Sequence, residues 1–230
     1  MENKYWPRES RANKTFTRSG SDNSDLNNYT YNEIGFRGNS IEEPIDMLAI
    51  GCSHTEGIGV NDNETWPYYL AENCGWNHIN MGYTGRSNDY ISRMTLTYLK
   101  EFNPKFLFVM YTYTSRREYF TEYGYQPWHP TPWGYFEDNY EKYKAFATLN
   151  TIEADIENYK KNKKIVELAC KENYTQLIWN GSFVNDNPID FESNRYDGDY
   201  NIKYGMHATA EENKKYSSKL VGFLKDNSYI

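Results

Sequence analysis

The twelve residues AIGCSHTEGIGV, Ala49 to Val60, connect an apolar run to a turn that holds a serine, a histidine and several glycines. The run that leads into them, DMLAIG, is short, apolar and ends on glycine, which is typical of a buried strand. Two interpretations fit Ser53. Either it belongs to an ordinary turn, where glycine supplies backbone freedom, or it is a nucleophile presented at the carboxyl end of a central strand. The remainder of the chain favours the second interpretation.

Strands and helices alternate after this stretch. Thr65 is a suitable N-cap for a helix that stops at Gly75, and Thr209 and Glu212 have the spacing of a capping box. Such alternation implies right-handed crossovers, so we expect an α/β fold, a three-layer αβα sandwich with a central parallel sheet. The expected strands and helices, in chain order, cover 46–51, 64–75, 76–82, 87–102, 105–113, much of 140–173, 174–180 and 209–225.

The length of 230 residues fits one domain with a sizeable core. Residues 1–30 are polar, and we expect them to form an N-terminal arm that is flexible or lies over the surface. Residues 31–230 are then a single domain. Within it, the aromatic stretch near 116–140 is too long for a tight connection, so we expect an insertion packed over one edge of the sheet.

The composition argues against several classes of partner. The formal net charge is −7 and no basic block stands out, so we expect no nucleic-acid partner and no binding to an anionic membrane. No stretch resembles a membrane span or a signal peptide, so we expect a cytoplasmic protein. Association with a virion, docked through the polar N-terminal arm, is the alternative. Abundant Asn, Lys and Tyr are also typical of A+T-rich genomes such as those of phages.

Sites for metals and cofactors are not indicated. The four histidines have no HxxxH or HExxH spacing, and GCSHTEGIG lacks the lysine of a phosphate-binding P-loop. The cysteines are odd in number and form no CxxC pair, so we expect free thiols in a reducing compartment. They are Cys52, Cys74 and Cys170.

Several polar loops are expected to converge on one crevice, because ligands gather at the carboxyl ends of parallel strands. Ser53 follows the first strand, Gly82 and Gly85 follow the second, and residues 112–115 follow the third. The loop ahead of the last helix reaches the same edge. The sequence therefore predicts a site at this edge of the sheet.

At this point the pattern resembles the SGNH (GDSL-type) hydrolases. The block around Ser53, the Asn-x-Gly-x-x-Gly turn that begins at Asn80 and the segment around His207 are similar to three conserved blocks of that superfamily. The resemblance runs from about residue 30 to the C-terminus and implies a flavodoxin-like SGNH fold. The segments that carry it cover 30–39, 47–72, 79–91, 103–118 and 204–220.

The resemblance implies a role for each matching residue. Ser53 would be the nucleophile, its backbone N–H one oxyanion donor and that of Gly85 a second. His207 would be the general base. The family usually places an asparagine after the third strand as a third donor, and here Thr114, with Thr112 close by, takes that place.

The acid of the triad is missing from its usual position. The family has an aspartate three residues before the histidine, where this chain has Tyr204. Three alternatives follow: a Ser-His dyad, an acid contributed by Asp197 or Asp199 of the adjacent loop, or impaired catalysis.

Four further residues are expected to contact substrate. His54 lies beside the nucleophile, although adjacent side chains usually point apart and a packing role is the alternative. Asn88 and Arg116 lie at the crevice edge. Arg116, or its neighbour Arg117, would bind an anionic or polyhydroxyl group unless it pairs with Glu118 or with a helix end. His129 lies in the aromatic insertion, where rings could stack on a sugar.

These expectations combine into two functions. The first is a serine ester hydrolase that removes O-acyl groups, mainly acetyl, from a small-molecule or glycan ester. The alternative is a catalytically impaired SGNH-fold module that binds glycans or forms a structural part of a larger, virion-like assembly. The oligomeric state is not predicted.

Overall fold

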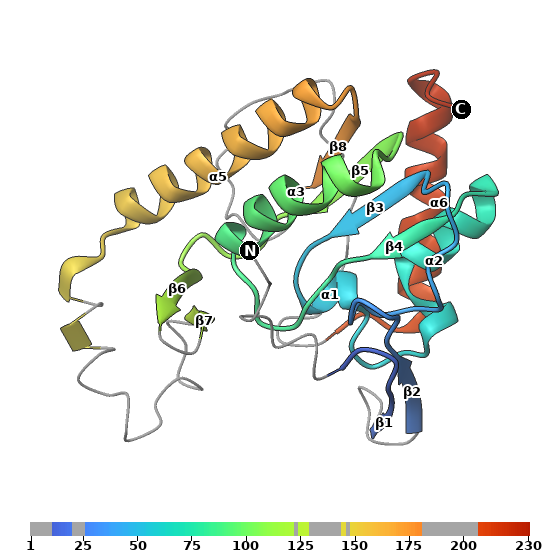
Figure 1. Cartoon of the computed structure of the whole chain (residues 1–230), viewed down its shortest axis with the longest axis horizontal. Helices are drawn as coiled ribbons and strands as arrows, with labels where there is room; N and C mark the ends of the chain where they lie inside the picture. Colours follow the sequence, from blue (N-terminus) through green and yellow to red (C-terminus); the bar gives the residue numbers. More distant parts are fainter. Residues whose placement is uncertain (1–10, 20–25, 122–123, 129–143, 146–147, 181–206) are drawn as a thin grey trace.

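A parallel four-stranded sheet forms the centre of the described chain (Figure 1). Its strands are β3 (Met47–Ile50), β4 (His78–Asn80), β5 (Phe106–Met110) and β8 (Gln176–Asn180), in the spatial order β4-β3-β5-β8. Numbered along the chain this is 2-1-3-4, the flavodoxin-like order, in which ligands bind outside the carboxyl ends of the first and third strands. The computed structural model describes residues 11–19, 26–121, 124–128, 144–145, 148–180 and 207–230.

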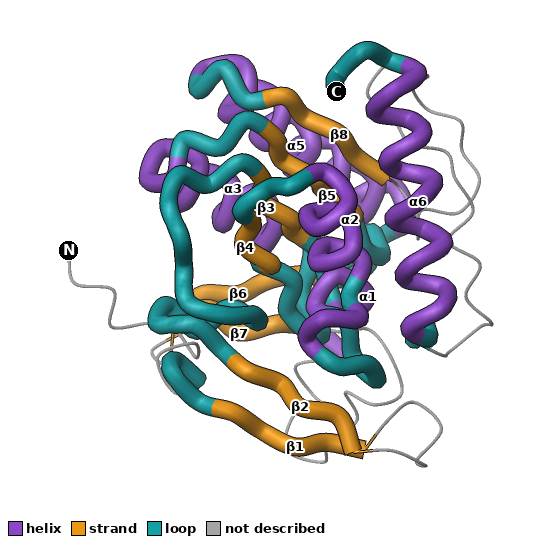
Figure 2. The backbone as a smooth tube through the Cα atoms, turned by 90° about the vertical axis from the view of Figure 1, so that its right-hand side faces the viewer, coloured by secondary structure: helices purple, strands orange, loops and turns teal. Residues whose placement is uncertain are grey.

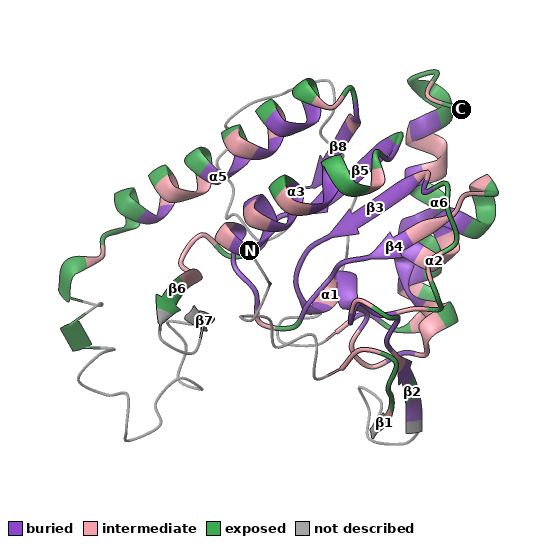
Figure 3. Cartoon of the chain, viewed as in Figure 1, coloured by how far each residue is buried: buried purple, intermediate pink, exposed green. Residues whose placement is uncertain are grey.

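Helices cover both faces of this sheet (Figure 2). Leu48 and Val109 belong to the core cluster on the side of α3 (Asn88–Phe102) and α5 (Ile152–Glu172). Their neighbours Ala49 and Phe108 point the other way, to the cluster beside α2 (Trp66–Cys74) and α6 (Ala210–Asp226). All residues of β3 and β5 are buried (Figure 3), which explains their continuous apolar runs. The expected three-layer αβα sandwich is confirmed.

The helix ends follow their sequence signals. Thr65 Oγ1 accepts from the Tyr68 N–H at 3.4 Å, and Gly75 ends α2 at a φ of 67°. The predicted capping box opens α6, where Glu212 accepts the N–H of Thr209 at 2.8 Å and returns its own N–H to the threonine hydroxyl. The expectation of helix over much of 140–173 is confirmed for α5, which begins after Thr151, and residues 144–145 and 148–149 are helical as well.

The described part of the expected N-terminal arm forms a hairpin that packs beside the Ser53 turn. β1 (Thr15–Ser19) and β2 (Leu26–Thr30) form an antiparallel hairpin. Asn27 and Tyr29 of β2 bond the backbone of Gly59 at 3.1 and 2.7 Å, just after the Ser53 turn. Alternation of buried and exposed residues along β2 carries this packing. It escaped the composition argument because its inward side chains are asparagine and tyrosine rather than aliphatic.

The expected insertion begins as a hairpin of β6 (Arg117–Thr121) and β7 (Gly124–Trp128). Glu118 ties it to α3 through a bidentate ion pair with Arg93, at 2.6 and 2.8 Å. Arg117 ties it to Asp155 of α5. The hairpin therefore starts beside the carboxyl edge of the sheet, where α3 begins (Figure 1); residues 129–140 of the insertion lie outside the described residues.

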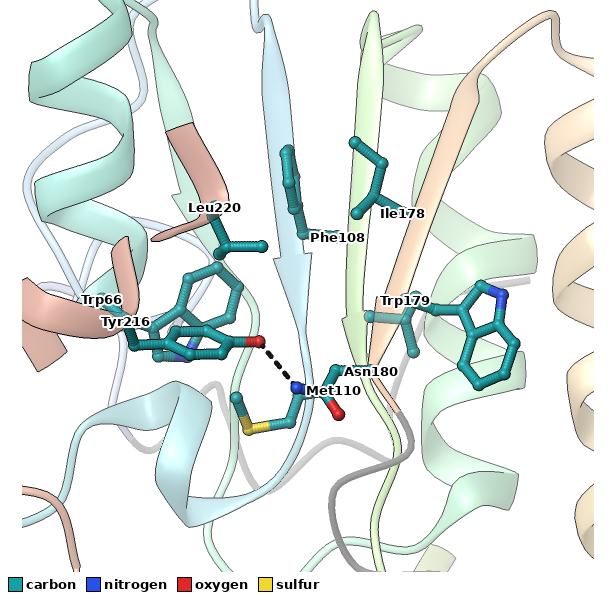
Figure 4. Close-up of a pocket in the computed structure, with 9 residues that line it drawn as sticks. Trp66, Phe108, Met110, Ile178, Trp179, Asn180, Tyr216 and Leu220 are labelled. Carbon is teal, nitrogen blue, oxygen red and sulfur yellow. Dashed lines mark hydrogen bonds between the residues drawn. The ribbon is translucent and has the colours of Figure 1, made fainter. Parts of the chain in front are cut away.

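A small cavity lies between the sheet and the α2–α6 layer (Figure 4). Trp66, Met110 and Tyr216 are among its lining residues, and Asn180 Nδ2 donates to Tyr216 Oη at 3.2 Å. Its volume of about 10 Å³ is at the lower limit for one water molecule, so it is a packing gap rather than a substrate site.

Cys52, Cys74 and Cys170 are free thiols. None of the described helices has the length and apolarity to cross a bilayer.

Arg37 links the hairpin to the segment that follows Ser53. Its buried guanidinium bonds Asp62 Oδ1 at 2.7 Å and the carbonyls of Glu56 and Val60, and lies 3.8 Å from the Tyr29 ring centroid. We expect Arg37→Ala to lower the free energy of unfolding by about 3–5 kcal/mol, because it leaves a carboxylate and several carbonyls without their donor. Denaturant unfolding measures this loss.

The control is Lys105→Ala, which removes an ion pair to Asp46 whose lysine side chain is 71% exposed. Its expected cost is below about 1 kcal/mol. Equal losses for the two variants would contradict the role given to Arg37.

Candidate active site

Ser53 stands where the first central strand ends. β3 stops at Ile50, and Ser53 is the first residue of the short helix α1 (Ser53–Glu56). Gly51 is required between them, since a Cβ there would lie 2.1 Å from Thr55 Oγ1 and 3.0 Å from the Met110 carbonyl oxygen. Ser53 is 6% exposed, so its hydroxyl lies in a nearly closed, partly desolvated turn. This is the carboxyl end of a central parallel strand, the edge at which ligands bind in such sheets.

The loop between β4 and α3 passes directly against α1. A Cβ on Gly82 would lie 2.1 Å from the Glu56 backbone nitrogen, so only glycine permits this approach. Asn80 fixes the loop, because its amide donates to the Thr55 carbonyl at 2.8 Å and accepts the Gly82 N–H at 3.0 Å. Gly85 follows with a φ of 76°. The expected oxyanion loop is therefore held against the serine turn.

Glu56 is a residue that the sequence analysis did not single out. Its side chain is fully buried and accepts from Tyr31 Oη at 2.9 Å and from Arg11 Nη1 at 3.2 Å. Its other oxygen accepts the Thr84 N–H at 2.6 Å and the Thr84 hydroxyl. Glu56 thus fixes the residue before Gly85. The available signal was an acid one helical turn after Ser53.

Two histidines meet beside this turn. His207 lies just ahead of α6, and its ring centroid is 5.0 Å from that of His54. Burial lowers the pKa of His54 to about 3, with help from His207 and Arg116. Burial also lowers the pKa of His207; the Glu56 carboxylate opposes that shift and Arg116 adds to it. Both imidazoles are therefore neutral at pH 7, the form that a general base requires.

The third strand brings Thr112 to the same edge. Its N–H donates to Asn88 Oδ1 at 3.0 Å and its carbonyl accepts from Asn88 Nδ2 at 3.1 Å. These two hydrogen bonds link the end of β5 to α3. They also engage the Asn88 side-chain amide, which was expected to bind substrate. The first bond occupies the backbone N–H of Thr112, so the Thr112 hydroxyl is the group left to donate. Thr114 is half-buried and its carbonyl accepts from Arg117.

Arg116 is the expected substrate contact that the structure places beside the histidines. Its Nη1 donates to Thr112 Oγ1 at 2.9 Å, and its charge acts on both imidazoles. The expected alternative, a pair with Glu118, does not form, because Arg93 takes that carboxylate. The predicted residues that lie outside the described part of the chain are His129, Asp197, Asp199 and Tyr204. Within the described residues, no group of three His, Cys, Asp or Glu side chains is placed to hold a metal.

Comparison with known proteins finds similar solved structures at low sequence identity. No protein-family model and no curated protein matches the sequence. Among solved structures, the chain is similar to TesA, at 9% identity and a TM-score of 0.48 over 79% of this chain and 98% of that one. It is also similar to a catalytic mutant of Axe2, an acetylxylan esterase from Geobacillus stearothermophilus, at 10% identity and a TM-score of 0.36 over 78% and 94%. The strand order is the flavodoxin-like order expected from the sequence, and Ser53 follows its first strand, β3.

Proposed function

We propose that the protein is a serine ester hydrolase that removes O-acyl groups, with acetylated carbohydrate as its substrate class. One observation carries the proposal: the neutral His207 imidazole lies 5.0 Å, between ring centroids, from that of His54, the residue next to Ser53. A serine and a neutral histidine at the carboxyl edge of a parallel sheet are the pair that acyl transfer needs. The carbohydrate preference rests on the family resemblance and the aromatic insertion.

The mechanism follows from these positions. Ser53 Oγ attacks the acyl carbon while His207 accepts the hydroxyl proton, and His207 returns that proton to the departing alkoxide. Water then attacks the acyl-enzyme and gives one proton to His207, which passes it to the departing Ser53 oxygen. The carboxylic acid product leaves and ionises in water. The tetrahedral oxyanion is held by the backbone N–H groups of Ser53 and Gly85, with the Thr112 hydroxyl as a third donor.

Activity assays test the proposal. With p-nitrophenyl acetate and a panel of acetylated xylose and glucosamine derivatives, we expect release of acetate above that of a heat-treated control. No turnover on any of these esters, together with binding of a deacetylated glycan, would favour the alternative of a non-catalytic module. One observation favours that alternative: the Thr112 backbone N–H, next to the family's third oxyanion position, is already bound by Asn88.

The pH dependence of hydrolysis should report the state of His207. Because the base must be neutral and burial lowers its pKa, activity persists below the pH at which an ordinary histidine becomes protonated. We expect kcat/KM to rise with pH along an acid limb whose midpoint lies below 6.5, the ordinary value. A midpoint above 6.5 would contradict the assignment of His207 in this environment.

Glu56→Gln should act on both the oxyanion loop and the base. Loss of the charged clamp on Thr84 loosens the loop that carries Gly85, so we expect kcat to fall roughly 10- to 100-fold with little change in KM. Since Glu56 favours the protonated form of His207, the acid limb should also move to lower pH.

The matched control is Glu64→Gln, which changes an acid of the helix η1 (Asp62–Glu64) that caps Asn61 and does not contribute to the shift in the pKa of His207. It should leave the limb in place. If the acid limb of the pH profile did not move in Glu56→Gln, Glu56 would have no electrostatic influence on His207.

A further inference from the structure

Carboxylate partners distinguish the arginines of this protein. Among the described side chains, Arg86 and Arg116 are the arginines that have no carboxylate partner. The guanidinium of Arg86 lies 4.4 and 5.7 Å from the ring centroids of Tyr83 and Tyr90, so its charge faces aromatic rings. The described pairs are Arg11 with Glu56, Arg37 with Asp62, Arg93 with Glu118 and Arg117 with Asp155.

Arg116 has a different environment, at the mouth of the candidate active site. Its Nη1 donates to Thr112 Oγ1, and its guanidinium carbon is 4.8 Å from the centroid of the Tyr113 ring. Its Nε, like that of Arg86, is buried and has no hydrogen-bond partner in the described chain, but only Arg116 acts on His54 and His207. A desolvated guanidinium N–H without an acceptor is costly, so this group is built to meet an acceptor that the described chain does not supply.

The charges around Arg116 identify the missing acceptor as an anion. His54 and His207 face it as neutral imidazoles and carry no negative charge. Two acids in the described part of the chain already have partners: Glu118 is paired with Arg93, and Glu56 accepts from Arg11, Tyr31 and Thr84. Among the described residues, the Arg116 guanidinium therefore has no carboxylate partner, although it lies beside the residues that would perform the reaction.

We propose that Arg116 binds an anionic group, a carboxylate or a phosphate, carried by the acylated substrate. The planar guanidinium matches either group through paired N–H donors. The proposal rests on the proposed function and narrows its substrate class to negatively charged acyl esters, such as an O-acetylated uronic acid or an O-acetylated sugar phosphate. Arg116 is then a specificity-determining residue that places the ester carbonyl near Ser53.

Matched substrates test this specificity. An O-acetylated methyl glucuronide and the corresponding glucoside, acetylated on the same hydroxyl, differ only in a carboxylate; an O-acetylated glucose phosphate provides the phosphate. We expect kcat/KM for at least one anionic ester to exceed that for the neutral ester by about 10- to 100-fold, the range of a charge-assisted hydrogen bond. Which anionic ester is preferred identifies the source of the charge.

The variants Arg116→Gln and Arg117→Gln separate this site from general charge effects. Arg117 adjoins Arg116 but has its own partner, Asp155. The preference ratio should fall to near 1 in Arg116→Gln and persist in Arg117→Gln. Should Arg116→Gln fail to fold, the wild-type ratio measured against salt serves instead, because screening reduces a preference that depends on charge.

Failure of this proposal is distinguishable from failure of the proposed function. Ser53-dependent turnover with equal rates on neutral and anionic esters overturns the anion site and leaves the hydrolase intact. If no ester is hydrolysed, calorimetric titration of methyl glucuronide and of glucose phosphate into the protein decides the matter. Binding lost in Arg116→Gln supports the site, and no binding of either anion overturns it.

Discussion

Replacing Ser53 by alanine should lower kcat for p-nitrophenyl acetate by about 10⁴-fold or more while the protein stays folded. The loss is large because the acyl-enzyme cannot form without the hydroxyl, and only binding and oxyanion stabilisation remain. The cost in stability should be about 1 kcal/mol, the value of a single hydroxyl contact. Steady-state kinetics and thermal unfolding of the same preparation measure both quantities.

Ser218→Ala is the matched control for this experiment. Ser218 lies on the exposed side of α6, where its hydroxyl bonds the Lys214 carbonyl at 3.0 Å. We expect full activity from this variant. Residual activity in Ser53→Ala within 10-fold of the wild type would mean that another nucleophile, or simple solvent attack, accounts for the turnover.

The second large effect concerns the two adjacent histidines. We expect His207→Ala to reduce kcat by about 10³- to 10⁴-fold, since it removes the general base. His54→Ala should cost less than about 10-fold, because consecutive residues of a helix do not face each other and His54 cannot align with the Ser53 hydroxyl. The reverse ranking would assign the base to His54 and contradict the mechanism.

The loops at the carboxyl edge of the sheet could be predicted because short sequence patterns mark the strands and helices that flank them. A short apolar run ended by glycine located β3, and cap residues such as Thr65 and Thr209 located the helices. Parallel topology then required these loops to share one edge. Placement of Ser53 and Thr112 therefore followed from local signals together with one rule of topology.

Other parts of the site depend on contacts that no local pattern contains. Glu56 is held by Arg11, Tyr31 and Thr84, which are 45, 25 and 28 residues away in sequence. The sequence indicated that the Asn88 amide was available to bind substrate. In the structure, both the nitrogen and the oxygen of that amide are hydrogen-bonded to the backbone of Thr112, 24 residues later in the chain. Hydrogen-bond partners so far apart become neighbours only through the fold, so a single sequence does not reveal them.

The central claim is that Ser53 is a nucleophile activated by His207, and covalent labelling tests it most directly. A serine-directed fluorophosphonate followed by peptide mass spectrometry should place one label per chain on Ser53, since the reaction needs an activated hydroxyl and an oxyanion hole. The label should be absent from Ser53→Ala and slow to form in His207→Ala. A folded wild-type protein that takes no label, or takes it at another residue, would contradict the claim.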